Sequence, residues 1–257
     1  MGKIIAVANQ KGGVGKTTTA VNLAAGLGEK GKKVLLVDLD PQGNATSGFG
    51  ISKKEVEISG YDVQILSTPV EKATIRTKFK NVSIVPSHIS LAGAEIELVE
   101  LENRSLGLRA SLLQVKDQYD FIIIDCPPSL GLITVNALAA SDTILIPIQP
   151  EYYALEGLSQ LMSTVRTVKR MYNSQLEIEG VLLTMYDGRL NLTLQVVDEV
   201  KKFFAGKIFK TIIPRNVRLS EAPSFGQPIM YYDRSSRGAE AYMNQTAEVI
   251  RNNSTKK

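Results

Sequence analysis

The chain has 257 residues, 44% of them hydrophobic, and a formal net charge of +4. This length and apolar content suit one α/β domain over residues 1–257, which would bury about three-quarters of its unfolded surface. Its single cysteine and single histidine argue against a disulfide framework and against a zinc or iron–sulfur site within one chain, and no apolar run approaches the roughly 18 residues of a membrane span.

The first predicted elements are a strand, a glycine-rich loop and a helix. The apolar run Ile4–Ala8 precedes the loop Asn9–Thr18, and a helical pattern covers Thr19–Lys30. This order is the context of a phosphate-binding loop, whose glycines let backbone N–H groups converge on a phosphate at the start of a helix. Lys16 would reach the β- and γ-phosphates, and the Thr17 hydroxyl would bind Mg²⁺.

The loop departs from the general pattern at one position. The pattern G-x-x-x-x-G-K-[ST] requires glycine where this chain has Gln10, and Lys11 follows. The dinucleotide-binding alternative G-x-G-x-x-G fails, because its last glycine is Thr18 here. An ordinary strand-to-helix turn would not need two lysines, so we interpret the loop as a nucleoside-triphosphate site.

A second buried strand, Lys33–Leu36 running into Asp38, ends in two carboxylates and a turn. Carboxylates at this strand end would lie beside the phosphate loop, because ligands bind at the carboxyl ends of parallel strands. Asp40 would position the water that attacks the γ-phosphate, Asp38 would help to order the ligands around Mg²⁺, and Gln42 and Asn44 would complete the hydrogen bonding. The alternative is that either aspartate only caps the turn around Pro41.

The middle of the chain gives weaker signals until the next buried strand. Residues 51–81 are polar and weakly periodic, so we expect small helices and a loop. A strand follows at Val82–Val85, and a helical pattern covers Ala94–Tyr119.

Phe121–Ile124 is an apolar run that ends at Asp125. This is the form of a Walker-B strand, whose aspartate holds Mg²⁺ directly or through a water. We expect this strand to neighbour the strand that leads into the phosphate loop. Cys126 is interpreted as a small buried residue, because no histidine is near it in the sequence.

The alternation of strands and helices continues to the C-terminus. Further strands are predicted at Thr143–Pro147, Glu179–Thr184 and Lys207–Ile213, and further helices at Thr134–Ala140, Leu155–Tyr172, Leu192–Ala205 and Arg237–Asn252. Continuous Val/Ile/Leu runs indicate strands that are buried on both faces. The predicted fold class is therefore α/β, with a doubly wound and mostly parallel sheet flanked by helices.

Charge is distributed unevenly along the chain. Residues 189–257 contain 12 Lys and Arg against 6 Asp and Glu, whereas residues 1–188 contain 18 against 20. A basic C-terminal quarter on a neutral body suggests a surface for a polyanion, and a merely solvated face is the alternative.

Five segments together resemble one family. They are K-G-G-V-G-K-T-T, D-L-D-P-Q-G-N-A-T-S-G, I-I-I-D-C-P-P-S-L-G, E-Y-Y-A-L-E-G-L and I-P-R-N-V-R-L-S-E-A-P-S. They are similar to motifs of the P-loop ATPases with a deviant Walker A loop, and within these to the ParA/Soj chromosome-partitioning proteins. The resemblance runs from about Met1 to Glu248. The last two segments, Glu151–Leu158 and Ile213–Ser224, are the ones that point to Soj.

The resemblance implies ATP and Mg²⁺ as cofactors and a set of residues around them. The phosphates would be held by Gly12, Gly13, Val14, Gly15, Lys16, Thr17 and Thr18. Thr17 would also ligate Mg²⁺, with Asp125 behind it through a water, and Asp40 would serve hydrolysis together with Lys11 and Lys16. Pro214, Arg215 and Asn216 would border the adenine.

The resemblance also implies an ATP-bound homodimer. Lys11 would reach the partner's phosphates, as an arginine finger does in trans, which is worth ~10³–10⁵ in rate. Gly12 would lie where two loops face each other, with room for little beyond hydrogen. Glu151 would lie near the nucleotide across the dimer.

The implied function is a switch on DNA. The ATP-bound dimer would bind double-stranded DNA without sequence preference, and a ParB-type centromere-binding protein would stimulate a hydrolysis that is weak alone. Arg189 and Arg218 match basic positions that the family uses for DNA, although Arg218 has the alternative of anchoring the nucleotide-site loop. Weaker candidates are Lys201, Lys202, Lys207 and Lys210. We expect a cytoplasmic, nucleoid-associated protein without stable membrane association.

Three other functions compete with this interpretation. A MinD-like membrane-positioning ATPase needs a C-terminal amphipathic helix, and residues 247–257 offer only Val249 and Ile250 as its apolar face. An iron–sulfur protein of the same fold would need more than one cysteine. A scaffold that binds ATP without hydrolysing it would not need Lys11, Asp40 and Asp125 together.

Overall fold

The computed structural model describes residues 2–101 and 104–254. The strands are β1 (Lys3–Val7), β2 (Val34–Asp38), β3 (Ile75–Arg76), β4 (Val82–Val85), β5 (Phe121–Asp125), β6 (Thr143–Ile148) and β7 (Glu177–Leu183). The α-helices are α1 (Lys16–Glu29), α2 (Asn44–Gly48), α3 (Gly60–Ile65), α4 (Val70–Ala73), α5 (Leu91–Glu100), α6 (Gly107–Val115), α7 (Leu132–Ala140), α8 (Ala154–Met171), α9 (Asn191–Phe203), α10 (Val217–Glu221), α11 (Ile229–Tyr232) and α12 (Arg237–Ser254). Short 3-10 helices lie at Lys53–Glu55, Lys116–Gln118 and Ala222–Phe225.

The strands form one sheet in the order β3-β4-β2-β5-β1-β6-β7, in which only the β3–β4 pair is antiparallel among the described strands. This confirms the predicted fold class. β5 lies between β1 and β2, with Asp125 opposite both Val7 and Asp38. The expected proximity of the Walker-B strand and the phosphate-loop strand is therefore confirmed, and their polar ends share one edge of the sheet.

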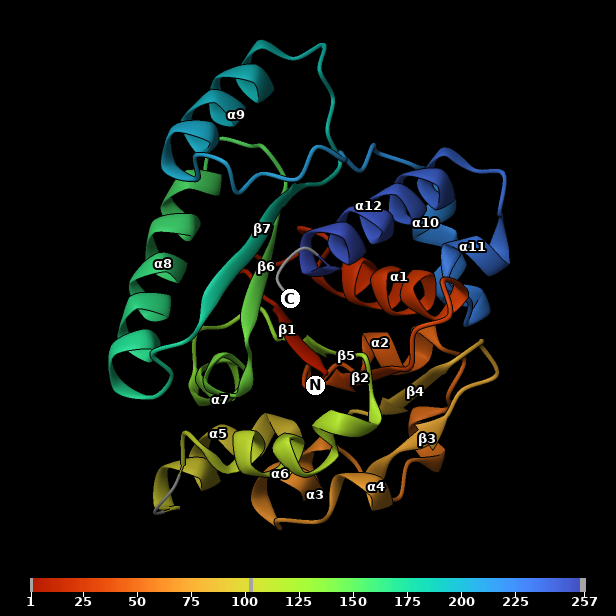
Figure 1. The fold of residues 1–257 in the computed structure, drawn as a ribbon, viewed down its shortest axis with the longest axis vertical. Helices are drawn as coiled ribbons and strands as arrows, with labels where there is room; N and C mark the ends of the chain where they lie inside the picture. The colour runs from red at the N-terminus through yellow and green to blue at the C-terminus, as the bar shows by residue number, and fades with distance from the viewer. Residues whose placement is uncertain (1, 102–103, 255–257) are drawn as a thin grey trace.

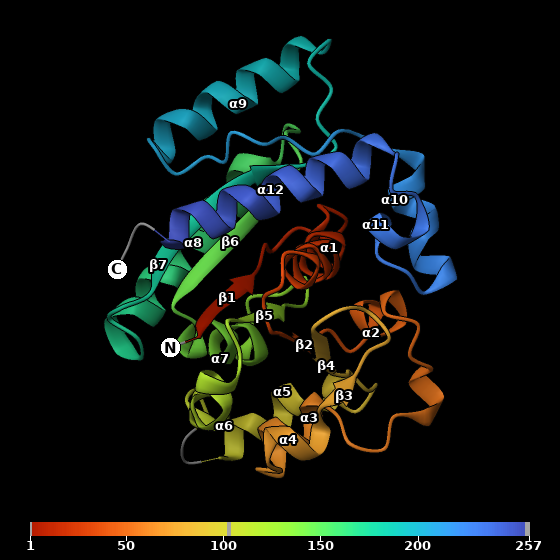
Figure 2. The same cartoon turned by 45° about the vertical axis from the view of Figure 1, so that its right-hand side comes forward.

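Helices cover both faces of this sheet (Figure 1). α1 and α12 lie over one face, and α5, α6, α7 and α8 lie over the other, as Figure 2 also shows. Along β2, Val34 and Leu36 join the core under α1, whereas Leu35 and Val37 join the opposite core. The strand is apolar throughout because successive side chains point to opposite, equally buried faces. One domain over residues 1–257 remains the prediction for this arrangement.

Two glycines let α1 approach its neighbours closely. A Cβ atom at Gly26 would clash with the Thr246 side chain of α12, and one at Gly28 with the Lys80 carbonyl. The close packing fixes α1, and therefore its N-terminus at Lys16, against the end of the sheet. Among the described residues, no helix combines the length and the apolar character that crossing a membrane would demand.

The single helix predicted over Ala94–Tyr119 is wrong. The structure has α5 and α6 instead, followed by the 3-10 turn at Lys116–Gln118, and residues 102–103 of the predicted helix lie outside the described residues. The chain is extended at Leu101, and the Asn136 side chain of α7 donates a hydrogen bond to the Arg104 carbonyl. This tertiary contact satisfies backbone outside a helix, which local periodicity does not reveal.

The strand predicted over Lys207–Ile213 is also wrong. An isolated bridge pairs Ile208 with Val181 of β7, and separate backbone hydrogen bonds join Lys207, Phe209 and Ile213 to β7 without forming a continuous strand. Phe209 packs so closely on Gly180 that a Cβ atom there would clash with its ring. Its apolar residues therefore anchor a connecting segment to the core. Two predictions are closer: α1 begins at Lys16 rather than Thr19, and residues 51–81 do contain small helices, with the two-residue β3.

Candidate nucleotide-binding site

The loop between β1 and α1 is shaped by two glycines and braced by polar side chains. Gly13 and Gly15 have φ angles of +74° and +85°, in the left-handed region that favours glycine, and Gly15 caps α1. The Asn9 amide donates to the Pro147 carbonyl at 2.8 Å and accepts from the Lys11 N–H at 3.1 Å. The Thr184 hydroxyl donates to the Val14 carbonyl at 2.8 Å. The loop is therefore hydrogen-bonded to the carboxyl ends of β6 and β7.

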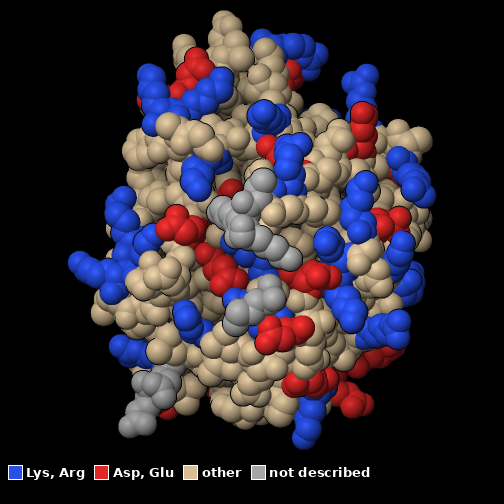
Figure 3. Space-filling view, in the orientation of Figure 1, with Lys and Arg blue, Asp and Glu red and all other residues tan. Residues whose placement is uncertain are grey.

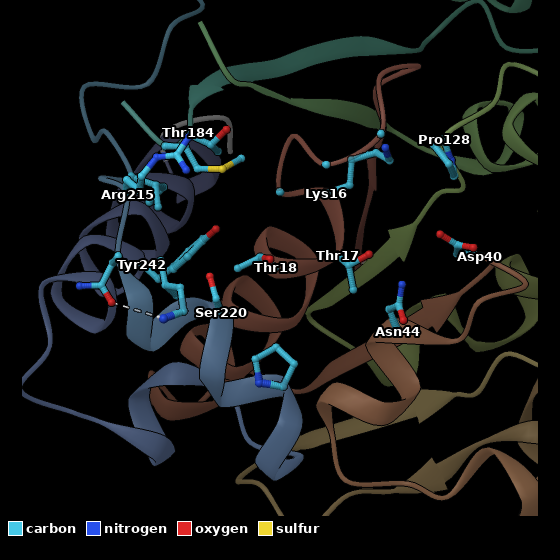
Figure 4. A pocket seen from close by; sticks show the side chains of 18 of the residues that line it. Lys16, Thr17, Thr18, Asp40, Asn44, Pro128, Thr184, Arg215, Ser220 and Tyr242 are labelled. Atoms are coloured by element: carbon cyan, nitrogen blue, oxygen red, sulfur yellow. Dashed lines mark hydrogen bonds between the residues drawn. The ribbon is translucent and has the colours of Figure 1, made fainter. Parts of the chain in front are cut away.

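A cavity of about 500 Å³ opens beside this loop. It is lined by Gly12, Gly13, Gly15, Lys16, Thr17, Thr18, Asp40, Gln42, Asn44, Pro128, Thr184, Met185, Ile213, Pro214, Arg215, Asn216, Leu219, Ser220, Pro223 and Tyr242. Figure 4 shows the start of α1 between two walls, with Asp40, Asn44 and Pro128 on one side and Arg215, Ser220 and Tyr242 on the other. The volume, and a mixed lining of apolar, polar and charged side chains, suit a nucleotide.

The structure brings together most of the residues predicted for phosphate and base contacts. Five loop residues, Asp40 and the run Pro214–Asn216 line the cavity together with Gly12. The other predicted residues lie outside its lining; these are Lys11, Val14, Asp38, Asp125, Glu151, Arg189 and Arg218. Nucleotide binding by the lining residues stays a prediction, and the geometry shows only that they share one space.

Lys16 lies at the mouth of the loop. Its side chain is largely buried, and Nζ donates to the Lys11 carbonyl at 2.9 Å. Burial lowers the pKa of Lys16, and the carboxylates of Asp125 and Asp40 oppose that change. An ammonium held here would gain from an anionic ligand, because few water molecules solvate it.

Asp125 is a buried carboxylate without a hydrogen bond of ordinary geometry to any described residue. Burial and the neighbouring Asp38 raise its pKa well above the usual range, against the lowering effects of the Thr17 hydroxyl and the Lys16 ammonium. A buried carboxylate without a hydrogen-bond partner is costly unless a cation lies near it. Within residues 2–101 and 104–254, no three His, Cys, Asp or Glu side chains gather to hold a metal, so other oxygens would have to complete its coordination.

Asp40 both faces the cavity and caps the turn that follows β2, and its role in hydrolysis stays a prediction. It lines the cavity, and its Oδ1 accepts a hydrogen bond from the Gln42 N–H at 2.9 Å, which caps the turn. Asp38, by contrast, is fully buried behind the cavity. Burial raises the pKa of Asp38 to about 6, against hydrogen bonds from Thr46 and from the Asp40 N–H.

Lys11 and Glu151 form an ion pair outside the cavity, with 2.7 Å between Nζ and Oε2. Both side chains are partly exposed, at 32% and 49%. Beside them, Gly12 is sterically free, because a Cβ atom there would meet only Pro128, at 4.0 Å. Nothing within the described chain therefore requires glycine at this position.

The two arginines predicted for DNA are exposed and held by acidic neighbours. Arg189 Nη2 lies 2.6 Å from Asp187 Oδ2, and this pairing lowers the pKa of Asp187 to about 2. Arg218 Nη1 lies 2.8 Å from Glu221 Oε2 on α10. Both arginines stand next to cavity-lining segments, near Met185 and Leu219. In Figure 3, lysines and arginines outnumber acidic side chains over the α10–α12 side of the molecule.

Sequence reasoning missed several lining residues. Thr184 and Tyr242 come from the end of β7 and from α12, far from the motifs in the sequence. Tyr242 is buried, and its hydroxyl lies 3.1 Å from the Thr19 hydroxyl of α1. Leu219, Ser220 and Pro223 lie in the motif Ile213–Ser224, so the sequence pointed to their segment but did not predict these three as site residues.

A parallel sheet whose first strand ends in a glycine loop that caps the next helix defines a P-loop nucleotide-binding protein. A family model described as an AAA domain matches residues 2–178. The sporulation initiation inhibitor protein Soj of Bacillus subtilis is 60% identical over 252 residues, which cover 98% of this chain and all of that protein. The chromosome partitioning protein ParA of Myxococcus xanthus is 51% identical, covering 100% of this chain and 90% of that protein. This chain therefore belongs to the Soj/ParA family of chromosome-partitioning ATPases.

Solved structures agree with this assignment of the fold. Cobyrinic acid a,c-diamide synthase of Mycobacterium smegmatis, with bound ADP and magnesium, is 34% identical with a TM-score of 0.87, covering 100% of this chain and 97% of that one. The MinD cell division ATPase of Pyrococcus furiosus is 28% identical with a TM-score of 0.78, covering 98% of this chain and 99% of that one. The shared fold includes proteins of different function.

Proposed function

We propose that this protein is an ATP-dependent DNA-partitioning switch, in which an ATP-bound dimer binds DNA without sequence preference and hydrolysis resets it. The observation that carries the proposal is that the two lysines of the loop lie in different surroundings. Lys16 and Gly12 line the cavity, whereas the Lys11 ammonium lies outside the cavity lining and pairs with the partly exposed Glu151. A second subunit would bring its phosphates to the Lys11 ammonium.

ATP and Mg²⁺ fit the residues that surround the cavity. Lys16 and the backbone of Gly13 and Gly15 would hold the phosphates, and Pro214–Asn216 would border the adenine. Thr17 would hold Mg²⁺ directly and Asp125 through a water, which would give the orphaned carboxylate its cation. When bound, the metal would neutralise charge on the phosphates. The structure of the synthase from Mycobacterium smegmatis holds ADP and magnesium.

Dimerisation would complete the catalytic site. The Lys11 ammonium would leave Glu151 and reach the partner's phosphates, and Gly12 would allow two loops to meet closely. Asp40, on the cavity wall, would orient the attacking water. Each subunit would then hydrolyse ATP only while paired, so that hydrolysis separates the pair.

DNA binding would follow from pairing, because two basic C-terminal quarters neutralise more phosphates than one. Arg189 and Arg218 are proposed contacts, and a ParB-type protein is the proposed activator. We place the protein in the cytoplasm on the nucleoid. Against a MinD-like membrane role, Val249 is buried in the core and Ile250 packs against it, so α12 has no free apolar face at these positions.

The test is DNA binding by gel shift with ATP or ADP, for the natural chain and for Gly12→Val. We expect binding with ATP, little with ADP, and none with Gly12→Val, which should still bind ATP; a Cβ atom at this position lies 4.0 Å from Pro128. Equal binding with both nucleotides would contradict the proposal.

A further inference from the structure

A ring of buried polar groups lies behind the cavity wall that carries Asp40. It joins the end of β2, the helix α2 and the segment after β4, which are distant in sequence. Asp38, Thr46 and Ser87 are fully buried, and Asp40 is 7% exposed. Most polar groups this deeply buried are hydrogen-bonded, and removing one partner leaves the other unsatisfied at a cost in free energy.

The ring begins at Asp38, whose carboxylate serves three donors of this chain. Its Oδ1 accepts from the Asp40 N–H at 3.2 Å, and its Oδ2 accepts from the Thr46 N–H at 2.8 Å and the Thr46 hydroxyl at 2.7 Å. These bonds occupy the carboxylate inside the protein. The structure thus places Asp38 as an anchor for the loop that follows β2, and its ordering role around Mg²⁺ stays a prediction.

The ring closes through Ser87. The Ser87 N–H donates to the Thr46 hydroxyl oxygen at 2.9 Å, and the Ser87 hydroxyl donates to the Asp40 carbonyl at 2.5 Å. The Gly43 N–H donates to the same carbonyl at 2.8 Å. Asp40 is consequently held at its N–H by Asp38 and at its carbonyl by Ser87.

This leaves one oxygen of Asp40 for the cavity. Oδ1 accepts from the Gln42 N–H at 2.9 Å, and among the described residues no hydrogen bond engages Oδ2. The ring fixes the backbone of Asp40 on both sides, and the Gln42 N–H holds Oδ1, so these contacts together set the direction of Oδ2. A displacement of about 1 Å in such a group can cost about 10²-fold in rate.

We propose that Ser87 and Thr46 are positioning residues for hydrolysis, which act through the backbone of Asp40. This inference rests on the proposed function, since it assumes that Asp40 serves ATP hydrolysis. Neither hydroxyl lines the nucleotide cavity, so their loss should spare ATP binding. The consequence is a slower hydrolysis step, which prolongs the life of the ATP dimer.

The test compares Ser87→Ala with Ser47→Ala. The second change removes a hydroxyl of α2, next to Thr46 in the sequence, whose bond to the Gly43 carbonyl at 3.2 Å lies outside the ring. For Ser87→Ala we expect kcat to fall about tenfold or more, the Kd for ATP to change less than about twofold, and the ATP dimer to dissociate more slowly. Ser47→Ala should behave as the natural chain. Loss of ATP affinity or a shorter-lived dimer would indicate loop damage and overturn the inference, as would an unchanged kcat.

A second pair of variants guards against misfolding. Thr46→Ser keeps the hydroxyl of the ring and should keep kcat, whereas Thr46→Val keeps the shape, loses the hydroxyl and should lower kcat at least as much as Ser87→Ala. If both Thr46 variants lose activity equally, side-chain shape matters rather than the hydrogen bond, and the inference is wrong.

Asp40→Ala separates a failure of the proposed function from a failure of the positioning role. If Asp40→Ala hydrolyses ATP at the natural rate, the proposed function fails; if Asp40→Ala is slow and Ser87→Ala is normal, only the positioning role fails.

Discussion

The phosphate loop and the basic C-terminal quarter are held by different kinds of contact. Around the loop, Asn9 and Thr184 donate to backbone carbonyls, and Gly15 adopts a conformation that favours glycine. In residues 189–254, by contrast, Arg189 and Arg218 project into solvent and pair with nearby carboxylates. Exposed ion pairs contribute about 0–1 kcal/mol, whereas a broken buried network costs several times more. We therefore expect substitutions in the loop to abolish ATP binding or hydrolysis, and substitutions on the basic surface to lower DNA affinity by degrees.

The largest effect should come from Lys11→Ala. If Lys11 acts across a dimer, DNA-stimulated ATP turnover should fall about 10³-fold, or about 4 kcal/mol in activation free energy. The Kd for ATP should change little, because Lys11 does not line its own cavity. Steady-state ATPase assays measure the loss, with Lys30→Ala at the far end of α1 as the control. A loss below about tenfold would place Lys11 outside the catalytic site.

Next in size is Lys16→Ala, which acts inside the cavity. Removing the buried ammonium should weaken ATP binding by about 10²-fold, or about 2.7 kcal/mol, and abolish ATP-dependent DNA binding with it. Isothermal titration calorimetry with ATP and Mg²⁺ measures the change. An affinity within about threefold of the natural chain would show that the cavity does not bind phosphates through Lys16.

A graded effect is expected for Arg189→Glu on the basic surface. DNA affinity should fall about tenfold, and the slope of log affinity against log salt should become shallower by about 0.9 for each DNA phosphate that the variant no longer neutralises. ATP binding and dimerisation should persist, since Arg189 is exposed and outside the cavity. Arg170→Glu, on α8, is the matched charge control. An unchanged salt slope would remove Arg189 from the DNA surface.

The smallest effect should come from Glu151→Gln, which releases Lys11 from its ion pair. An exposed pair is worth about 0.2–1 kcal/mol, so dimer formation should tighten by no more than about fivefold, and most at low salt. Sedimentation at several protein concentrations measures it, with Glu156→Gln as the control. A weaker dimer would show that Glu151 contacts the partner's nucleotide, as the family resemblance implies.

Local patterns were enough to predict the parts of the site that are contiguous in sequence. The run from β1 through the loop to α1 carries its own signals, and so do Asp40 after β2 and Asp125 at the end of β5. Their convergence followed from the parallel sheet, because the carboxyl ends of neighbouring strands share an edge. The strand register shows this convergence, because Asp125 lies opposite both Val7 of β1 and Asp38 of β2.

The remaining features depend on tertiary contacts that local patterns do not encode. The apolar residues of 207–213 resemble a strand, yet Phe209 packs on Gly180 and the segment makes an isolated bridge and separate backbone hydrogen bonds to β7 instead of a strand pairing. Thr184 and Tyr242 reach the cavity from elements without a nucleotide motif. The hydrogen bonds that Asp38 accepts from Thr46 and from the Asp40 N–H depend on the folded turn, so the local pattern did not predict them.

The most direct test of the central claim is analytical ultracentrifugation of Asp40→Ala with saturating ATP and Mg²⁺, with Gly12→Val in the same background as the control. A dimer predicts a mass of roughly twice the 28.1 kDa of the chain, and the Gly12→Val control should stay at the single-chain mass while still binding ATP. Sedimentation of ATP-saturated Asp40→Ala as a single chain would contradict the account, because Lys11 and Gly12 would then have no partner to act upon.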